Sequence, residues 1–152
     1  MAYSASEART QLLDDIADAT DQLALAVAAL TEAYEELDEQ TADQLEEELF
    51  RPAQHAYGRL RRTYAEFADR YRLPTRSFES SSGGVHSGDP RVYVERAVEA
   101  IERADLGLSE LQDSMMPVEV GDRELREGLS AVREAIDELP ARARRLMRSQ
   151  GR

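Results

Sequence analysis

Apolar residues recur three and four positions apart in four stretches of the chain, a spacing typical of amphipathic helices. In the second stretch aromatic residues mark the spacing every seven positions, at Phe50, Tyr57, Tyr64 and Tyr71. Each stretch places its apolar residues on one face of a helix, and the four faces together can enclose one core. The pattern predicts four helices, at about residues 6–37, 41–72, 90–115 and 122–148.

Polar residues just before these stretches predict where the helices begin. One of the first serines, Ser4 or Ser6, can cap the first helix by accepting a backbone N–H. Thr41, with a glutamine three residues later, has the form of a capping box for the second helix. Asp89, followed by proline, and Asp122, preceded by glycine, predict the starts of the third and fourth helices.

Two prolines lie inside predicted helices. Proline has no backbone N–H and clashes with the carbonyl four residues earlier, which costs about 3 kcal/mol in a regular helix. We therefore expect the second helix to kink near Pro52 and the fourth to bend or split near Pro140, just after Leu139. At Pro52 the kink either wraps the helix around the core or opens the backbone toward a pocket.

The connections predict how the helices are joined. Residues 38–40 form a link so short that the first two helices must run antiparallel as a hairpin. Residues 74–88, rich in serine and glycine, are predicted to be a mobile loop before a second hairpin. We thus predict an all-α, antiparallel four-helix bundle, a single domain over residues 1–152 in up-down-up-down order. The flexible loop also permits a homodimer with exchanged hairpins.

Composition limits the classes of function. With 41% apolar residues, 33% charged residues and a net charge of −12, the chain suits a helical globular domain that repels nucleic acid. No apolar run of roughly 18 residues predicts a membrane span, so we expect a cytoplasmic protein. The absence of cysteine excludes disulfides and thiolate sites. All 19 basic residues are arginine, a bias typical of high-GC bacterial genomes.

Charge is segregated along the chain. Residues 1–48 carry fourteen acids and one arginine, whereas residues 49–76 carry two acids and seven arginines. Folding each hairpin about its turn predicts complementary flanks, with pairing that sets register more than stability. The first hairpin would set Asp14, Asp15, Asp18 and Asp21 beside Arg59, Arg61, Arg62 and Arg70. The second would set Glu95 and Glu99 near Arg142, Arg144 and Arg145.

Two groups on the second helix are candidate binding residues. Arg51, His55, Arg59 and Arg62, spaced four, four and three apart, form a cationic face that suits an anion or an acidic partner surface. The alternative is that these arginines only pair with acids of the first helix. Tyr57 and Tyr64 could line a pocket, although aromatic residues at helical spacing are typical of a core.

The sequence contains none of the common catalytic motifs. A di-metal bundle needs Glu-x-x-His, but proline stands three residues before His55. No glycine-rich phosphate loop or nucleophile elbow occurs, so we predict no enzyme activity, no catalytic or metal-binding residue and no cofactor. The predicted function is a protein-protein interaction or scaffold module. The alternatives are a small-ligand or anion sensor beside the second helix and a metal-dependent enzyme.

Overall fold

The structure is a computed structural model that describes residues 4–78 and 88–150 of the chain. Within these ranges the protein contains helices and no strand, which confirms the predicted all-α fold class. The elements are α1 (Ala5–Glu35), α2 (Glu39–Leu45), the π-helical turn η1 (Glu46–Phe50), α3 (Arg51–Tyr71), α4 (Pro90–Asp113), α5 (Met116–Glu119), α6 (Arg123–Ile136) and α7 (Leu139–Gln150). The predicted mobile loop lies mostly in residues 79–87, outside the described residues.

Three of the four predicted helix starts are confirmed. Ser4 accepts the Glu7 N–H at 3.1 Å, and the Glu7 carboxylate accepts the Ser4 N–H at 3.3 Å, so the pair forms a capping box. Asp89 caps α4 by accepting the Arg91 N–H at 3.0 Å. Asp122 caps α6 in the same way. These side chains satisfy backbone donors that the first turn leaves without a partner.

The start predicted at Thr41 is wrong by two residues. Asp38 has an extended backbone and accepts the Thr41 N–H at 2.8 Å, so α2 begins at Glu39. The Thr41 hydroxyl instead donates to the Asp38 carboxylate at 3.1 Å, and the side chain is buried. An aspartate caps at least as well as a threonine, and here it comes first along the chain.

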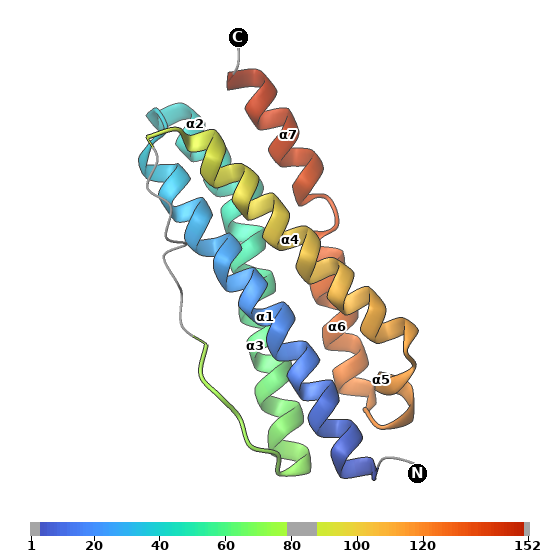
Figure 1. Cartoon of the computed structure of the whole chain (residues 1–152). Coiled ribbons are helices and arrows are strands. Elements are labelled where there is room, and N and C mark those ends of the chain that lie inside the picture. Colours follow the sequence, from blue (N-terminus) through green and yellow to red (C-terminus); the bar gives the residue numbers. More distant parts are fainter. Residues whose placement is uncertain (1–3, 79–87, 151–152) are drawn as a thin grey trace.

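Helix α1 lies at the centre of the packing. It packs most extensively against α4 and also against α3, while α3 packs against α6. Alanine is frequent among the buried residues of both α1 and α4, and small side chains let two helices approach closely. Figure 1 shows α4 crossing α1 along much of its length. The core is therefore one apolar cluster that all the longer helices share.

The order of helix directions differs from the predicted up-down-up-down arrangement. Arg70, near the end of α3, pairs with Asp122, which follows α4 and α5, so α3 and α4 end at the same end of the bundle. Figure 1 shows both helices running downward, with α1 and α6 running upward. An extended chain covers about 3.3 Å per residue and a helix only 1.5 Å, so the long connection can span the bundle. The order is up-down-down-up.

The break at Pro140 comes slightly earlier than predicted. Helix α6 ends at Ile136 and α7 begins at Leu139, so the chain splits just before Leu139 rather than after it. Proline is tolerated in the first turn of a helix because the N–H it lacks would have no helical partner there. Pro140 therefore lies near the start of a new helix, which packs against α4 and η1.

Helices α3 and α6 cross closely at a glycine. A β-carbon built on Gly128 would lie 2.3 Å from the Thr63 hydroxyl oxygen and 2.7 Å from the Thr63 methyl carbon. Both residues are buried, so the two helices would have to move apart to admit a side chain. By contrast, a β-carbon on the exposed Gly107 would meet no atom within 4 Å.

We expect Gly128→Ala to lower the free energy of unfolding by about 1–3 kcal/mol because of overpacking. The matched control Gly107→Ala should raise it by about 0.5–1 kcal/mol, since alanine favours the helix. In a Thr63→Ala background the loss caused by Gly128→Ala should shrink. Urea denaturation measures the free energy of unfolding of wild type and of each variant. A gain in stability from Gly128→Ala alone would contradict the close crossing.

A polar network joins three helices at the lower end of the bundle. Arg70 donates two hydrogen bonds to Asp122, at 2.6 and 2.8 Å, and Asp122 also accepts the Leu125 N–H at 2.8 Å. The Arg9 guanidinium lies 4.1 Å from the centre of the Tyr71 ring and donates to the Val120 carbonyl. Burial raises the pKa of Asp122, but its hydrogen bonds, that from Arg70 first, outweigh burial and lower the pKa overall.

Asp122→Asn should remove the ion pair while keeping a capping side chain. Because the folded state lowers the pKa of Asp122, the pair stabilises the fold above the unfolded value of about 3.9 and is lost as the pH falls through the folded value. We expect the free energy of unfolding of wild type to exceed that of the variant by about 1 kcal/mol at pH 7. The difference should shrink once the pH falls below the unfolded value and through the lowered folded pKa of Asp122. Urea denaturation across pH tests this.

Glu127→Gln is the control, since Glu127 pairs with Arg123, whose side chain is 81% exposed. It should change the free energy of unfolding little at any pH. A difference between wild type and Asp122→Asn that stayed constant from pH 7 down to the lowest pH at which both remain folded would contradict the loss of this ion pair on protonation.

Candidate functional site

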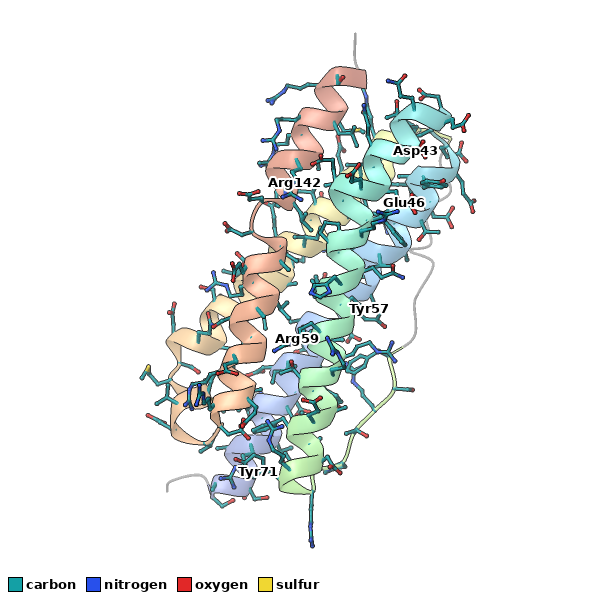
Figure 2. All side chains as sticks on the ribbon, turned by 180° about the vertical axis from the view of Figure 1, so that it is seen from behind. Asp43, Glu46, Tyr57, Arg59, Tyr71 and Arg142 are labelled. Carbon is teal, nitrogen blue, oxygen red and sulfur yellow. The ribbon has the colours of Figure 1, made fainter. Side chains whose placement is uncertain are left out.

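The π-helical turn η1 sets the direction in which α3 leaves the end of the bundle. The Arg51 N–H bonds to the Glu46 carbonyl, five residues earlier, and Pro52 has no N–H to offer the Glu48 carbonyl. The Arg142 guanidinium of α7 donates to that carbonyl at 3.3 Å. Figure 2 shows Arg142 between α7 and the helix formed by η1 and α3. The predicted irregularity near Pro52 is thus a π-turn whose opened backbone is occupied by Arg142.

The predicted cationic face lies on the outer side of α3. Arg51, His55 and Arg62 are exposed and Arg59 is half-buried, whereas the opposite side of the helix carries the buried Leu60. At 3.6 residues per turn, the four side chains fall within an arc of about 80°. Figure 2 shows Arg59 near the middle of α3. We call Arg51, His55, Arg59 and Arg62 the basic face.

The ion pairs predicted for the first hairpin do not form. Within residues 4–78 and 88–150, no carboxylate lies within salt-bridge distance of Arg59, Arg61 or Arg62. Asp21 pairs with Arg76 at 2.6 Å, and Arg70 pairs with Asp122 of α6. Pairing inside the hairpin therefore does not explain these charges.

The second hairpin matches its prediction more closely. Glu95, Glu99 and Arg144 line one groove of about 720 Å³ between α4 and α7. The ion pair that forms is between Arg144 and Glu102, at 3.5 Å, one turn beyond the predicted acids. Arg142 turns instead toward Glu48 and Glu138.

Tyr64 is both a core residue and an anchor for the chain that follows α3. Its side chain is buried, and its hydroxyl accepts the backbone N–H of Arg76 at 3.1 Å. The Phe78 ring meets the Tyr64 ring edge to face, with 4.9 Å between ring centres. We call residues 72–78 the returning segment, because they turn back along α3. Tyr57, half-buried, lies 5.3 Å below the Arg61 guanidinium.

Arg76 fixes the returning segment to α1. It donates two hydrogen bonds to Asp21, at 2.6 and 3.1 Å, and its guanidinium also lies 4.7 Å from the centre of the Phe78 ring. The hydrogen bond to Asp21 raises the pKa of Arg76 further above its ordinary value, so the pair stays charged. The segment is held at both α1 and α3.

A hollow of about 440 Å³ lies between α3 and the returning segment. It brings together two of the predicted site residues, Arg62 and Tyr64, but Arg51, His55, Tyr57 and Arg59 do not line it. The other lining residues include Arg61, Thr75 and Arg76, which sequence reasoning missed. Their only signal was the arginine content of residues 49–76, because the spacing of residues 72–78 predicts no fixed position for them.

In the described part of the chain, no three histidine, cysteine, aspartate or glutamate side chains gather as a metal site would require. None of the described helices is long and apolar enough to cross a membrane. Comparison with known proteins finds no matching family model, no matching curated protein and no matching solved structure.

The contact of Arg142 with the π-turn gives a test. Arg142→Met keeps the aliphatic stem but removes the donor, and it should lower the free energy of unfolding by about 1 kcal/mol. Pro52→Ala restores a backbone N–H near the Glu48 carbonyl. In that background Arg142→Met should therefore lower the free energy of unfolding by a smaller amount. A urea-denaturation double-mutant cycle measures the difference, with Arg145→Met as the exposed control. Strictly additive changes would show that Arg142 does not replace the missing donor.

Proposed function

We propose that this protein is a non-enzymatic helical-bundle module that binds an acidic surface of a partner protein through the basic face of α3. The observation that supports this is the lack of carboxylate partners for Arg51, Arg59 and Arg62 among the described residues. An arginine presents a planar fork of donors that matches a carboxylate, so such a face suits acidic side chains.

The rest of the chain makes this lack of partners informative. The protein has 31 acidic and 19 basic residues, so acids are in excess. At least six arginines in the described ranges pair with carboxylates, including Arg70, Arg76 and Arg133. Among the described residues, the basic face has no carboxylate partner in spite of this excess.

The rigidity of α3 favours binding by a preformed surface. Its inner side is buried through Leu60, Tyr64 and Phe67, and the helix packs against both α1 and α6. Binding would then need little ordering of the backbone, which lowers the entropic cost of association. Because the whole chain carries a net charge of −12, attraction would be confined to this face and would weaken with added salt.

A cytoplasmic location and a bacterial source belong to the same proposal and rest on the composition of the sequence. A second copy of the chain is the alternative partner, and sedimentation over a range of concentrations would detect it. The alternative function, a small-ligand or anion sensor, is favoured by one observation, the hollow beside Arg61 and Arg62.

The proposal predicts that Arg59→Glu with Arg62→Glu weakens partner binding without lowering the melting temperature. A quantitative affinity capture from the native host would identify the partner, and a titration with the purified partner would then give Kd. We expect the double variant to weaken binding at least tenfold, because each reversal replaces attraction with repulsion.

Arg145→Glu with Arg148→Glu is the matched control, since both arginines are exposed on α7 and the change in charge is identical. It should leave Kd within about twofold of wild type. Unchanged binding together with a lowered melting temperature in the α3 variant would show that Arg59 and Arg62 serve the fold rather than a partner.

A further inference from the structure

We infer that the hollow between α3 and the returning segment is a binding site for a phosphate-type anion. This goes beyond a surface for acidic protein partners, because the hollow is a concave site with fixed walls on two separate pieces of chain. Its walls are α3, from Gly58 to Ala65, and the returning segment, from Thr75 to Phe78. The basic face and the hollow share only Arg62.

The outer wall of the hollow is held in place by three contacts. The Tyr64 hydroxyl accepts the Arg76 N–H, the Phe78 ring packs on the Tyr64 ring, and the Arg76 guanidinium bonds to Asp21. Tyr64 is itself 5% exposed, so the first two contacts rest on a fixed core side chain. The hollow therefore exists without a ligand to form it.

The space inside the hollow comes from small residues on the inner wall. Gly58 and Ala65 lie one turn on either side of Arg61 and Arg62, on the same flank of α3. A β-carbon built on Gly58 would meet no atom within 4 Å. A larger side chain at position 58 would stand directly in the hollow. The volume of about 440 Å³ is ample for a phosphate group and part of the molecule that carries it.

The charges and donors of the hollow suit an oxyanion. Arg61 and Arg62 have no carboxylate partner among the described residues, whereas Arg76 forms an ion pair with Asp21. The Tyr57 ring supports the Arg61 guanidinium at 5.3 Å without neutralising it. The exposed hydroxyls of Thr75 and Ser77 add donors on the facing wall.

These donors favour phosphate over a single carboxylate. Two guanidinium groups on one wall and two hydroxyls on the other can surround an ion that carries three or four oxygens, whereas a carboxylate has two. A phosphate monoester also carries close to two negative charges at neutral pH, which matches the two unpaired arginines. The phosphate could belong to a small metabolite or to a phosphorylated side chain. A membrane phosphate is disfavoured because an anionic lipid surface repels a chain of net charge −12.

An NMR titration of the whole chain with inorganic phosphate tests the site. Chloride keeps the ionic strength constant during the titration. We expect saturable shifts in the amides of residues 58–65 and 75–78, and none from chloride alone. Arg61→Gln and Gly58→Leu should each weaken phosphate binding at least tenfold, the first by removing a donor and the second by filling the hollow. Arg51→Gln, on the same helix outside the hollow, should change it less than twofold.

The Gly58→Leu variant should stay folded, because leucine favours a helix more than glycine does. Its melting temperature should not fall, so weaker phosphate binding could not be attributed to unfolding. Titrations with phosphoserine and with vesicles containing phosphatidic acid distinguish the sources of phosphate. Binding of phosphate or phosphoserine at the hollow supports the site. The proposed site would be overturned by any of four results. These are no saturable shifts, shifts confined to other arginines, binding to vesicles alone, or phosphate binding by Gly58→Leu that equals wild type.

The outcome is separable from that of the proposed function. Partner binding is tested through Arg59, which lies outside the hollow, and Arg62, which both surfaces share. Phosphate binding is tested through Gly58 and Arg61, which lie outside the basic face. If Gly58→Leu and Arg61→Gln abolish phosphate binding but leave partner affinity unchanged, the two surfaces act independently.

Discussion

The packing of α1 between α3 and α4 is the interaction on which the rest of the structure depends. Helix α1 packs against both helices, and many of its buried residues are alanines, whose small side chains let helices approach closely. With α4 antiparallel to α1, the chain that leaves α3 must return along the bundle before α4 begins (Figure 1). That return brings Arg76 against Asp21 and Phe78 against Tyr64. The hollow beside Arg61 is thus a result of how two distant helices pair.

Much of the fold could be predicted from the sequence because residues close together in the chain determine where each helix lies. The three-and-four spacing of apolar residues located the helices, and Ser4, Asp89 and Asp122 marked three of their starts. The order of helix directions could not be predicted in the same way. Apolar spacing identifies the buried face of a helix but not which neighbour covers it. The buried alanines beside the main seam of α1 do not stand out in the sequence as a second apolar stripe.

The candidate site was predictable in its composition and not in its contacts. The segregation of arginine into residues 49–76 is visible in the sequence, and so is the cationic face of α3. Which acids meet those arginines depends on the path of the chain after Tyr71, which no local pattern determines. Pro52 likewise implies that the Glu48 carbonyl lacks its usual donor, but the choice of Arg142 as the replacement depends on the break before Leu139.

The separation in sequence between α1 and its main neighbour bears on how the protein folds. Helix α4 begins more than fifty residues after α1 ends, so the contacts that cover α1 have a high contact order. The first hairpin alone would leave the α4-facing side of α1 in water, and the second would leave the matching side of α4 uncovered. Neither half alone buries its apolar faces. We therefore expect the native structure to form cooperatively, when both halves dock.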